Sequence, residues 1–207
     1  ATIAAGGAAA NQICAVADVG LKVFELALPA PTADITRAPA MQERDCTATI
    51  AFGMEAIAGG TDLLCLGAVG VGQHAVAAAM LTALLGGDPA EWLAGEDDAT
   101  KANAIAAVER ALAAHGAALG DPLEILRHVG GREFAALVGA ILAARLQRIP
   151  VLLSGIVSLA AAAVLHRLND SALDHCAAAH AAHAPAHGRA LEALGLAPIL
   201  STEIAIE

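Results

Sequence analysis

Residues 53–80 read GMEAIAGGTDLLCLGAVGVGQHAVAAAM, and this stretch decides the fold class. It holds the end of a helical pattern, the apolar run 62–67 (DLLCLG), a turn with three glycines, and an alanine-rich helical pattern. A short apolar run that is closed by glycine and followed by a helix is typical of a buried strand in a parallel sheet. The stretch therefore predicts one strand–turn–helix unit of an α/β protein.

The same alternation continues on both sides of this unit. Further strands are predicted at Ile13–Val19 (ICAVADV), at Ile149–Gly155 (IPVLLSG) and within Ala197–Ile206. Helical patterns cover residues 42–57, 73–85, 98–114, 131–148, 156–168, 171–183 and 188–194, whereas residues 28–39 and 86–100 are expected to be loops. Strands that alternate with helices indicate a Rossmann-like three-layer α/β/α fold, with a parallel sheet and helices on both faces. We expect residues 1–207 to form a single domain.

Composition excludes several classes of function. The net charge of -10 and the aromatic content of 2% argue against nucleic-acid binding, which needs positive charge and stacking surfaces. The longest apolar run, Val151–Leu165, is shorter than the roughly 20 residues of a membrane span and reads as a buried strand and helix. We therefore expect no membrane partner and a cytoplasmic location. The four separated cysteines, without a CxxC pair, are expected to be buried thiols in a reducing compartment.

Small residues follow three of the predicted strands, and they are the first candidates for a binding site. In open α/β sheets ligands bind beyond the carboxyl ends of the strands. This rule selects as candidate substrate-binding residues Asp18, the glycine turn with Gly67, Gly70 and Gly72, and the pair Ser154 and Gly155. Backbone N–H groups in such turns can face an anion, although a glycine turn serves tight packing equally well. The spacing is neither GxGxxG nor a P-loop, so a dinucleotide-binding dehydrogenase is poorly supported.

The cations and histidines of the chain leave alternatives open. Lys101 follows an acidic loop, where it could hold a phosphate or simply be a solvated charge on a helix. His183 and His187 are spaced i, i+4, but Pro185 lies between them and no carboxylate completes a metal motif. We therefore expect no metal and no cofactor.

Several long motifs resemble one family of enzymes. They are AFGMEAIAGGTDLLCLG at 51–67, DPLEILRHVGGRE at 121–133, IPVLL at 149–153, LDHC at 173–176, RALEALGL at 189–196, AGGAAAN at 5–11 and VADVG at 16–20. Together they resemble the nicotinate-nucleotide:dimethylbenzimidazole phosphoribosyltransferases, in the same order along nearly the whole chain. The resemblance implies transfer of phosphoribose from nicotinate mononucleotide to 5,6-dimethylbenzimidazole, which gives α-ribazole 5′-phosphate in cobalamin biosynthesis.

The resemblance also implies partners and residue roles. The partners are a small-molecule nucleotide and a benzimidazole-type base, and a homodimer is expected. Lys101 matches the phosphate-binding lysine of the family, and His180 matches a histidine of its pattern. Glu207 falls near the family's general base, which would take a proton from the attacking base.

Departures from the family pattern lie in the same regions. The family turn GEMGIGN reads GAVGVGQ at 67–73, so Ala68 replaces a glutamate, and the family LLDG reads LLSG, so Ser154 replaces an aspartate. The family's N-terminal segment and the glycines of its C-terminal motif are expected to be missing from this chain. These changes leave two hypotheses, a phosphoribosyltransferase with a modified site and a non-catalytic relative that binds a nucleotide, a base or a partner subunit.

Overall fold

The structure is a computed structural model that describes residues 2–95, 98–181 and 184–200. The chain divides into two compact units, Ala1–Pro31 and Thr32–Glu207, and each is described by itself. The single domain expected over 1–207 therefore remains a prediction.

The first unit contains the helix α1 (Ala9–Val16). The strand predicted at Ile13–Val19 is therefore wrong, because Ile13 and Val16 belong to this helix. Asn11 starts the helix by accepting a hydrogen bond from the Ala8 backbone N–H (3.0 Å) with its side-chain oxygen. A short apolar run has no periodicity that separates a strand from a helix, so local capping decided between them here.

The second unit holds the remaining elements. The helices in this part of the chain are α2 (Glu43–Ala56), α3 (Gln73–Leu85), α4 (Pro89–Trp92), α5 (Asp98–His115), α6 (Pro122–Val129), α7 (Arg132–Gln147), α8 (Gly155–Leu168) and α9 (Pro185–Leu194), with 3-10 turns η1 (Gly116–Ala118) and η2 (Asp170–Leu173). The strands are β1 (Leu64–Leu66), β2 (Val151–Leu153), β3 (Cys176–His180) and β4 (Pro198–Leu200).

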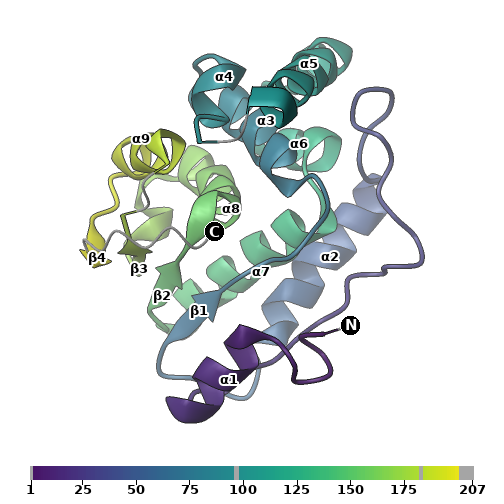
Figure 1. Cartoon of the computed structure of the whole chain (residues 1–207). Coiled ribbons are helices and arrows are strands. Elements are labelled where there is room, and N and C mark those ends of the chain that lie inside the picture. Colours follow the sequence, from purple (N-terminus) through teal and green to yellow (C-terminus); the bar gives the residue numbers. More distant parts are fainter. Residues whose placement is uncertain (1, 96–97, 182–183, 201–207) are drawn as a thin grey trace. The chain divides into compact units, whose positions relative to one another are not determined.

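The four strands form one parallel sheet in the order β1-β2-β3-β4 (Figure 1). The predicted Rossmann-like α/β class and its parallel sheet are confirmed. One face of the sheet carries the buried residues Val151, Leu153 and Ala178. The other face is less closely covered, since Cys65 and Ile199 are exposed. All three crossovers run from one strand to its neighbour, so the carboxyl ends of the strands share one edge.

Many buried residues of the helices are alanines, whose small side chains let the helices pack closely. Helix α8 packs against α3, α6, α7 and α9, and its residues from Leu159 to Val164 are completely buried. The apolar run at 151–165 is therefore the predicted buried strand followed by a buried helix. Among the described residues, no helix combines the length and hydropathy that crossing a membrane requires.

Helices α2 and α7 lie side by side and touch through glycine (Figure 1). A Cβ atom built on Gly53 would lie 2.0 Å from the Ala136 carbonyl oxygen, and one built on Gly139 would lie 2.0 Å from the Ile50 carbonyl oxygen. Any side chain at either position would force the two backbones apart. The two glycines thus permit a close crossing of this helix pair.

Two predictions for the second unit are corrected by the structure. The helix expected at 171–183 is wrong, because this region contains η2 and the strand β3. Alanine favours helix locally, but pairing with β2 and β4 on both sides outweighs this preference. Within the loop expected at 86–100, Asp88 caps the short helix α4 by accepting a hydrogen bond from Ala90 N–H (2.8 Å), and α5 already begins at Asp98.

The cysteines agree only in part with expectation. All four are free thiols, but only Cys46 is buried, while Cys65 is exposed and Cys14 and Cys176 are half-buried. Burial raises the pKa of the Cys46 thiol to about 11 and that of Cys176 to about 12, so both stay protonated at neutral pH. The expectation of four buried thiols is therefore wrong at three positions.

Candidate functional site

A cavity of about 180 Å³ lies at the carboxyl edge of the sheet. Its walls come from the ends of β1, β2 and β3 and from the first turns of α3 and α8. The lining residues are Leu66, Gly67, Ala68, Gln73, His74, Ser154, Gly155, Ile156, Val157, Ser158 and His180. A cavity in this position is where ligands bind in open α/β sheets.

Two helix N-termini meet at this cavity. Helix α3 starts after Gly72, whose left-handed backbone (φ 72°) turns the chain sharply from the glycine turn into the helix. Helix α8 starts after Ser154, directly beyond the end of β2. The unpaired N–H groups of a first helical turn carry partial positive charge, and they attract anions such as phosphate. The cavity can therefore hold an anion without a charged side chain.

Ser158 stabilises the start of α8. Its hydroxyl is buried, and it lies 2.8 Å from the carbonyl oxygen of Ser154 and 3.0 Å from that of Gly155. These hydrogen bonds engage backbone carbonyls and leave the first N–H groups of the helix available to a ligand. Gly155 itself has left-handed backbone (φ 76°), which favours glycine at this point.

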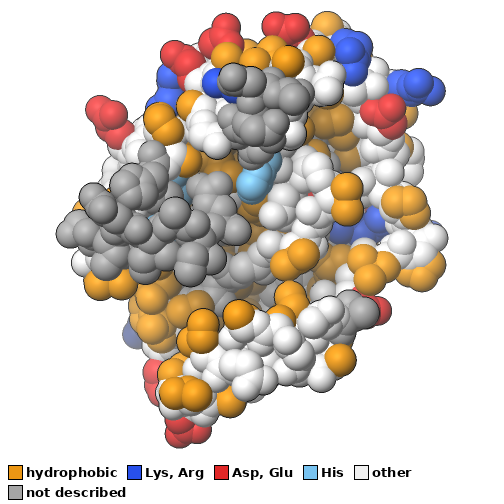
Figure 2. All heavy atoms as spheres, in the orientation of Figure 1, with side chains coloured by type: hydrophobic (Ala, Val, Ile, Leu, Met, Phe, Trp, Pro, Cys, Tyr) orange, Lys and Arg blue, Asp and Glu red, His pale blue; other side chains and the backbone are white. Residues whose placement is uncertain are grey.

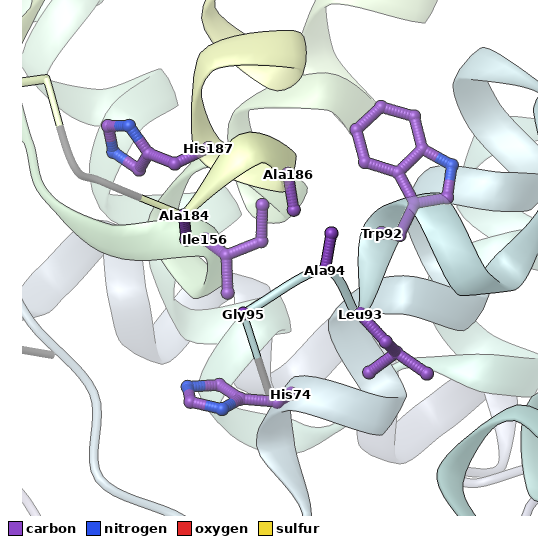
Figure 3. A pocket seen from close by; sticks show the side chains of 9 residues that line it. All are labelled: His74, Trp92, Leu93, Ala94, Gly95, Ile156, Ala184, Ala186 and His187. Carbon is purple, nitrogen blue, oxygen red and sulfur yellow. The ribbon is translucent and has the colours of Figure 1, made fainter. Parts of the chain in front are cut away.

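A smaller cavity of about 20 Å³ adjoins the first and shares His74 and Ile156 with it. Figure 3 shows its lining side chains, with His187 contributed by α9, His74 by α3 and Trp92 by α4. A void of this size has room for about one water molecule. The larger cavity is therefore the candidate binding site.

Helix α4 is attached to α9 next to the smaller cavity. The Arg189 guanidinium lies 2.5 Å from a Glu91 carboxylate oxygen and 4.8 Å from the centre of the Trp92 ring. The Trp92 indole N–H donates to the Gly86 carbonyl oxygen (2.9 Å). An ion pair and a cation–π contact at one arginine hold this segment beside the site.

His180 lines the cavity and also contacts the buried His187. It ends strand β3, and its ring stacks on that of His187 with centroids 5.4 Å apart. Burial, and then the neighbouring His180, lower the pKa of His187. A neutral His187 ring therefore supports His180 at the cavity wall.

Four of the predicted site residues meet at the cavity, namely Gly67, Ser154, Gly155 and His180. Gly70 and Gly72 lie in the same turn without lining the cavity. Lys101 is half-buried in the first turn of α5 and lines neither cavity. Asp18 follows α1 in the first unit with left-handed backbone (φ 53°), and Glu207 lies outside the described residues.

Sequence patterns missed several lining residues, including Gln73, His74 and Ser158. Two signals could have identified them. Gln73 and His74 are the first helical residues after the glycine turn, and Ser158 lies four residues beyond Ser154, one helical turn into α8. In both cases the position relative to a predicted helix start was the usable signal.

Charge is distributed unevenly around this region. On the face shown in Figure 2, acidic and basic side chains gather at the top of the view, over α4 and α5.

In the residues that the structure describes, no three histidine, cysteine or acidic side chains are grouped as metal ligands. His183, part of the i, i+4 pair, lies outside those residues. Fold and site together define a Rossmann-like α/β protein with a cavity at the carboxyl edge of its sheet, flanked by two helix N-termini.

Comparisons with known proteins identify the family. The phosphoribosyltransferase family model matches residues 1–207. Nicotinate-nucleotide–dimethylbenzimidazole phosphoribosyltransferases from Rhizobium johnstonii and Rhizobium meliloti are 58% and 56% identical to this chain over 201 residues. In each case the alignment covers 96% of this chain and 60% of the relative. The chain belongs to this phosphoribosyltransferase family.

Solved structures agree with this assignment. A crystal structure of the corresponding enzyme from Thermus thermophilus superposes with a TM-score of 0.88 at 31% sequence identity. The superposition covers 99% of this chain and 67% of that one. The sequence alignments likewise show that this chain spans about 60% of the length of the curated relatives that it matches.

Proposed function

We propose that this protein acts as a nicotinate-nucleotide:dimethylbenzimidazole phosphoribosyltransferase. It would transfer phosphoribose from nicotinate mononucleotide to 5,6-dimethylbenzimidazole and produce α-ribazole 5′-phosphate for cobalamin biosynthesis. The observation that carries the proposal is the pair of helix N-termini at a cavity of the carboxyl edge, in a chain more than half identical to enzymes with this name. The names of these relatives favour the transferase over the non-catalytic relative.

The cavity suits the nucleotide half of the reaction. The first turns of α3 and α8 would bind the 5′-phosphate through backbone N–H groups, and the ribose would lie in the cavity beside them. A nitrogen of the benzimidazole then attacks the anomeric carbon, and nicotinate leaves with the electron pair of the broken bond. Positive charge develops on the sugar during this step, as in glycosyl transfer generally.

The remaining site roles are proposed from the resemblance. Lys101 would add a positive charge for the phosphate, and Glu207 would take the proton from the attacking base. His180, which stands at the cavity wall, would contact the substrates. Asp18, in the first unit, stays a predicted substrate-binding residue. By the same resemblance we propose a single domain that forms a homodimer in the cytoplasm, and light scattering tests the oligomeric state.

The direct test incubates the purified protein with nicotinate mononucleotide and 5,6-dimethylbenzimidazole and follows α-ribazole 5′-phosphate by chromatography. Formation of the product supports the transferase and excludes the non-catalytic relative. Nucleotide binding without any product would support the non-catalytic relative instead. The absence of both binding and product would contradict both hypotheses.

Ala68 offers a sharper version of this test. It lines the cavity at the position where the family carries a glutamate, and a carboxylate there would face the developing positive charge. We expect Ala68→Glu to raise kcat by roughly 100-fold or more, the usual effect of one charge-stabilising group. Ala68→Gln is the matched control, because it has the same size without the charge and should leave kcat near the wild-type value.

A further inference from the structure

Two hydrogen-bond acceptors face the glycine turn beside the cavity. A Cβ atom built on Gly70 would lie 3.0 Å from Oε1 of Glu133 and 3.5 Å from Oε1 of Gln73. Gln73 opens α3 and lines the cavity, and Glu133 is the second residue of α7. Two residues 60 positions apart therefore bring their oxygens to one point of the turn.

The absence of side chains at Gly70 and Gly131 leaves room for the Glu133 carboxylate. Besides its approach to Gly70, its Oε2 lies 2.7 Å from where a Cβ of Gly131 would be. A side chain at Gly131 would displace the carboxylate, whereas a Cβ at Gly70 would shift it only slightly. The partial positive charge at the start of α7 favours a carboxylate in this position.

The Gln73 oxygen lacks a donor. Its Oε1 is buried and has no hydrogen-bond partner among the described residues. A buried acceptor without a donor destabilises a protein unless a ligand completes it. The Glu133 carboxylate, which lies beside the turn and not among the lining residues, is also an acceptor only, so a ligand that reaches both oxygens must bring hydrogen-bond donors.

We propose that Gln73 and Glu133 accept hydrogen bonds from the ribose hydroxyl groups of the bound nucleotide. This assignment rests on the proposed function, because it takes the substrate to be a nucleotide with a free ribose. Hydroxyl groups are the donors that a phosphoribosyl substrate carries next to its phosphate, and the phosphate would occupy the adjoining helix N-termini. The pair would thereby make the site specific for ribose over deoxyribose.

The test measures nucleotide affinity by isothermal titration calorimetry, which does not depend on turnover. Nicotinate mononucleotide is compared with its 2′-deoxy and 3′-deoxy analogues. We expect the intact protein to bind the ribose nucleotide roughly 10- to 100-fold more tightly than at least one analogue, as expected for a hydrogen bond to a charged or buried acceptor. Glu133→Ala and Gln73→Met should each remove most of this preference by weakening only the ribose nucleotide.

A second variant and a control variant complete the test. Gly131→Ala displaces the Glu133 carboxylate without replacing it, and it keeps the test valid if Glu133→Ala fails to fold. Glu109→Gln, an exposed charge change on α5, should bind all three nucleotides as the wild type does. Equal affinity of the wild type for the three nucleotides would overturn the inference and leave the proposed function intact. An equal loss for all three nucleotides in the variants would also overturn it, whereas absence of any nucleotide binding would overturn the proposed function as well.

Discussion

At the scale of single residues, one chain of side chains links three segments of the second unit. His115 lies 2.8 Å from the carbonyl oxygen of Ile35 through Nε2, and its Nδ1 lies 2.9 Å from Nδ1 of His128. On the far side, Nη2 of Arg127 lies 2.6 Å from Nε2 of His128. The Ile35 carbonyl can only accept a hydrogen bond, and the Arg127 guanidinium can only donate one. The hydrogen bonds of this series therefore all run in one direction, from Arg127 through the two histidines to Ile35. In this arrangement His128 donates from Nδ1 and accepts from Arg127 at Nε2.

This arrangement makes stability depend on pH. Burial, followed by the charge of Arg127 and the neighbouring His115, lowers the pKa of His128 below its usual 6.5, although Glu124 opposes the shift. Burial likewise lowers the pKa of His175 and His187. Below about pH 6.5 the unfolded chain takes up protons that the folded protein does not, so protonation favours unfolding.

We therefore expect the free energy of unfolding to be highest above about pH 6.5 and to fall as the pH decreases toward the folded pKa values. Urea denaturation at about pH 7.5 and about pH 5.5 measures the difference. His128→Gln should lose about 1 kcal/mol at the higher pH through its broken hydrogen bonds, yet show a smaller decline on acidification. An equal decline in variant and wild type would rule out His128 as a source of the pH dependence.

At the scale of elements, the close crossing of α2 and α7 depends on Gly53 and Gly139. Because a Cβ on Gly139 would overlap the Ile50 carbonyl oxygen, Gly139→Ala forces the helices apart. We expect a loss of about 1–3 kcal/mol in the free energy of unfolding, measured in urea.

Gly188→Ala provides the matched control for this prediction. Gly188 also lies within a helix, but a Cβ there would meet nothing within 4 Å. Alanine in that position should stabilise the protein by about 0.5–1 kcal/mol, since it favours helix over glycine. If Gly139→Ala were as stable as Gly188→Ala, the close crossing would not be a determinant of stability.

At the scale of the whole molecule, ligand binding is linked to stability. A nucleotide that binds only the folded protein should raise the midpoint of thermal unfolding by roughly 5–10 °C at about 100 times its dissociation constant. Differential scanning fluorimetry with nicotinate mononucleotide measures this shift. Nicotinate alone, which lacks the ribose and the phosphate, should shift the midpoint far less, because the proposed contacts of the helix N-termini are made to the phosphate. An equal shift with nicotinate would place the main contacts away from those helices.

The family relationship carries one consequence at the same scale. Ala68 and Ser154 line the cavity, and by the resemblance they replace a glutamate and an aspartate of the family pattern. A nucleotide bound there as proposed would meet the same backbone N–H groups but two fewer negative charges. Affinity for the nucleotide should be less affected than the chemical step, because backbone N–H groups do not change with the side chain.

The sequence by itself determined the α/β class, most helices, three of the four strands and the glycine turn, because each depends on local periodicity and on residues such as glycine and proline. It also located Gly67, Ser154 and Gly155, since strand ends in a parallel sheet share one edge. Ile13–Val16 was misread as a strand although its helix is capped locally by Asn11. Only the tertiary structure decided that residues 176–180 form a strand, because pairing with β2 and β4 outweighs the local preference of alanine for helix. It alone brought Glu133 to Gly70, because contact between residues distant in sequence arises from helix packing and leaves no local signal.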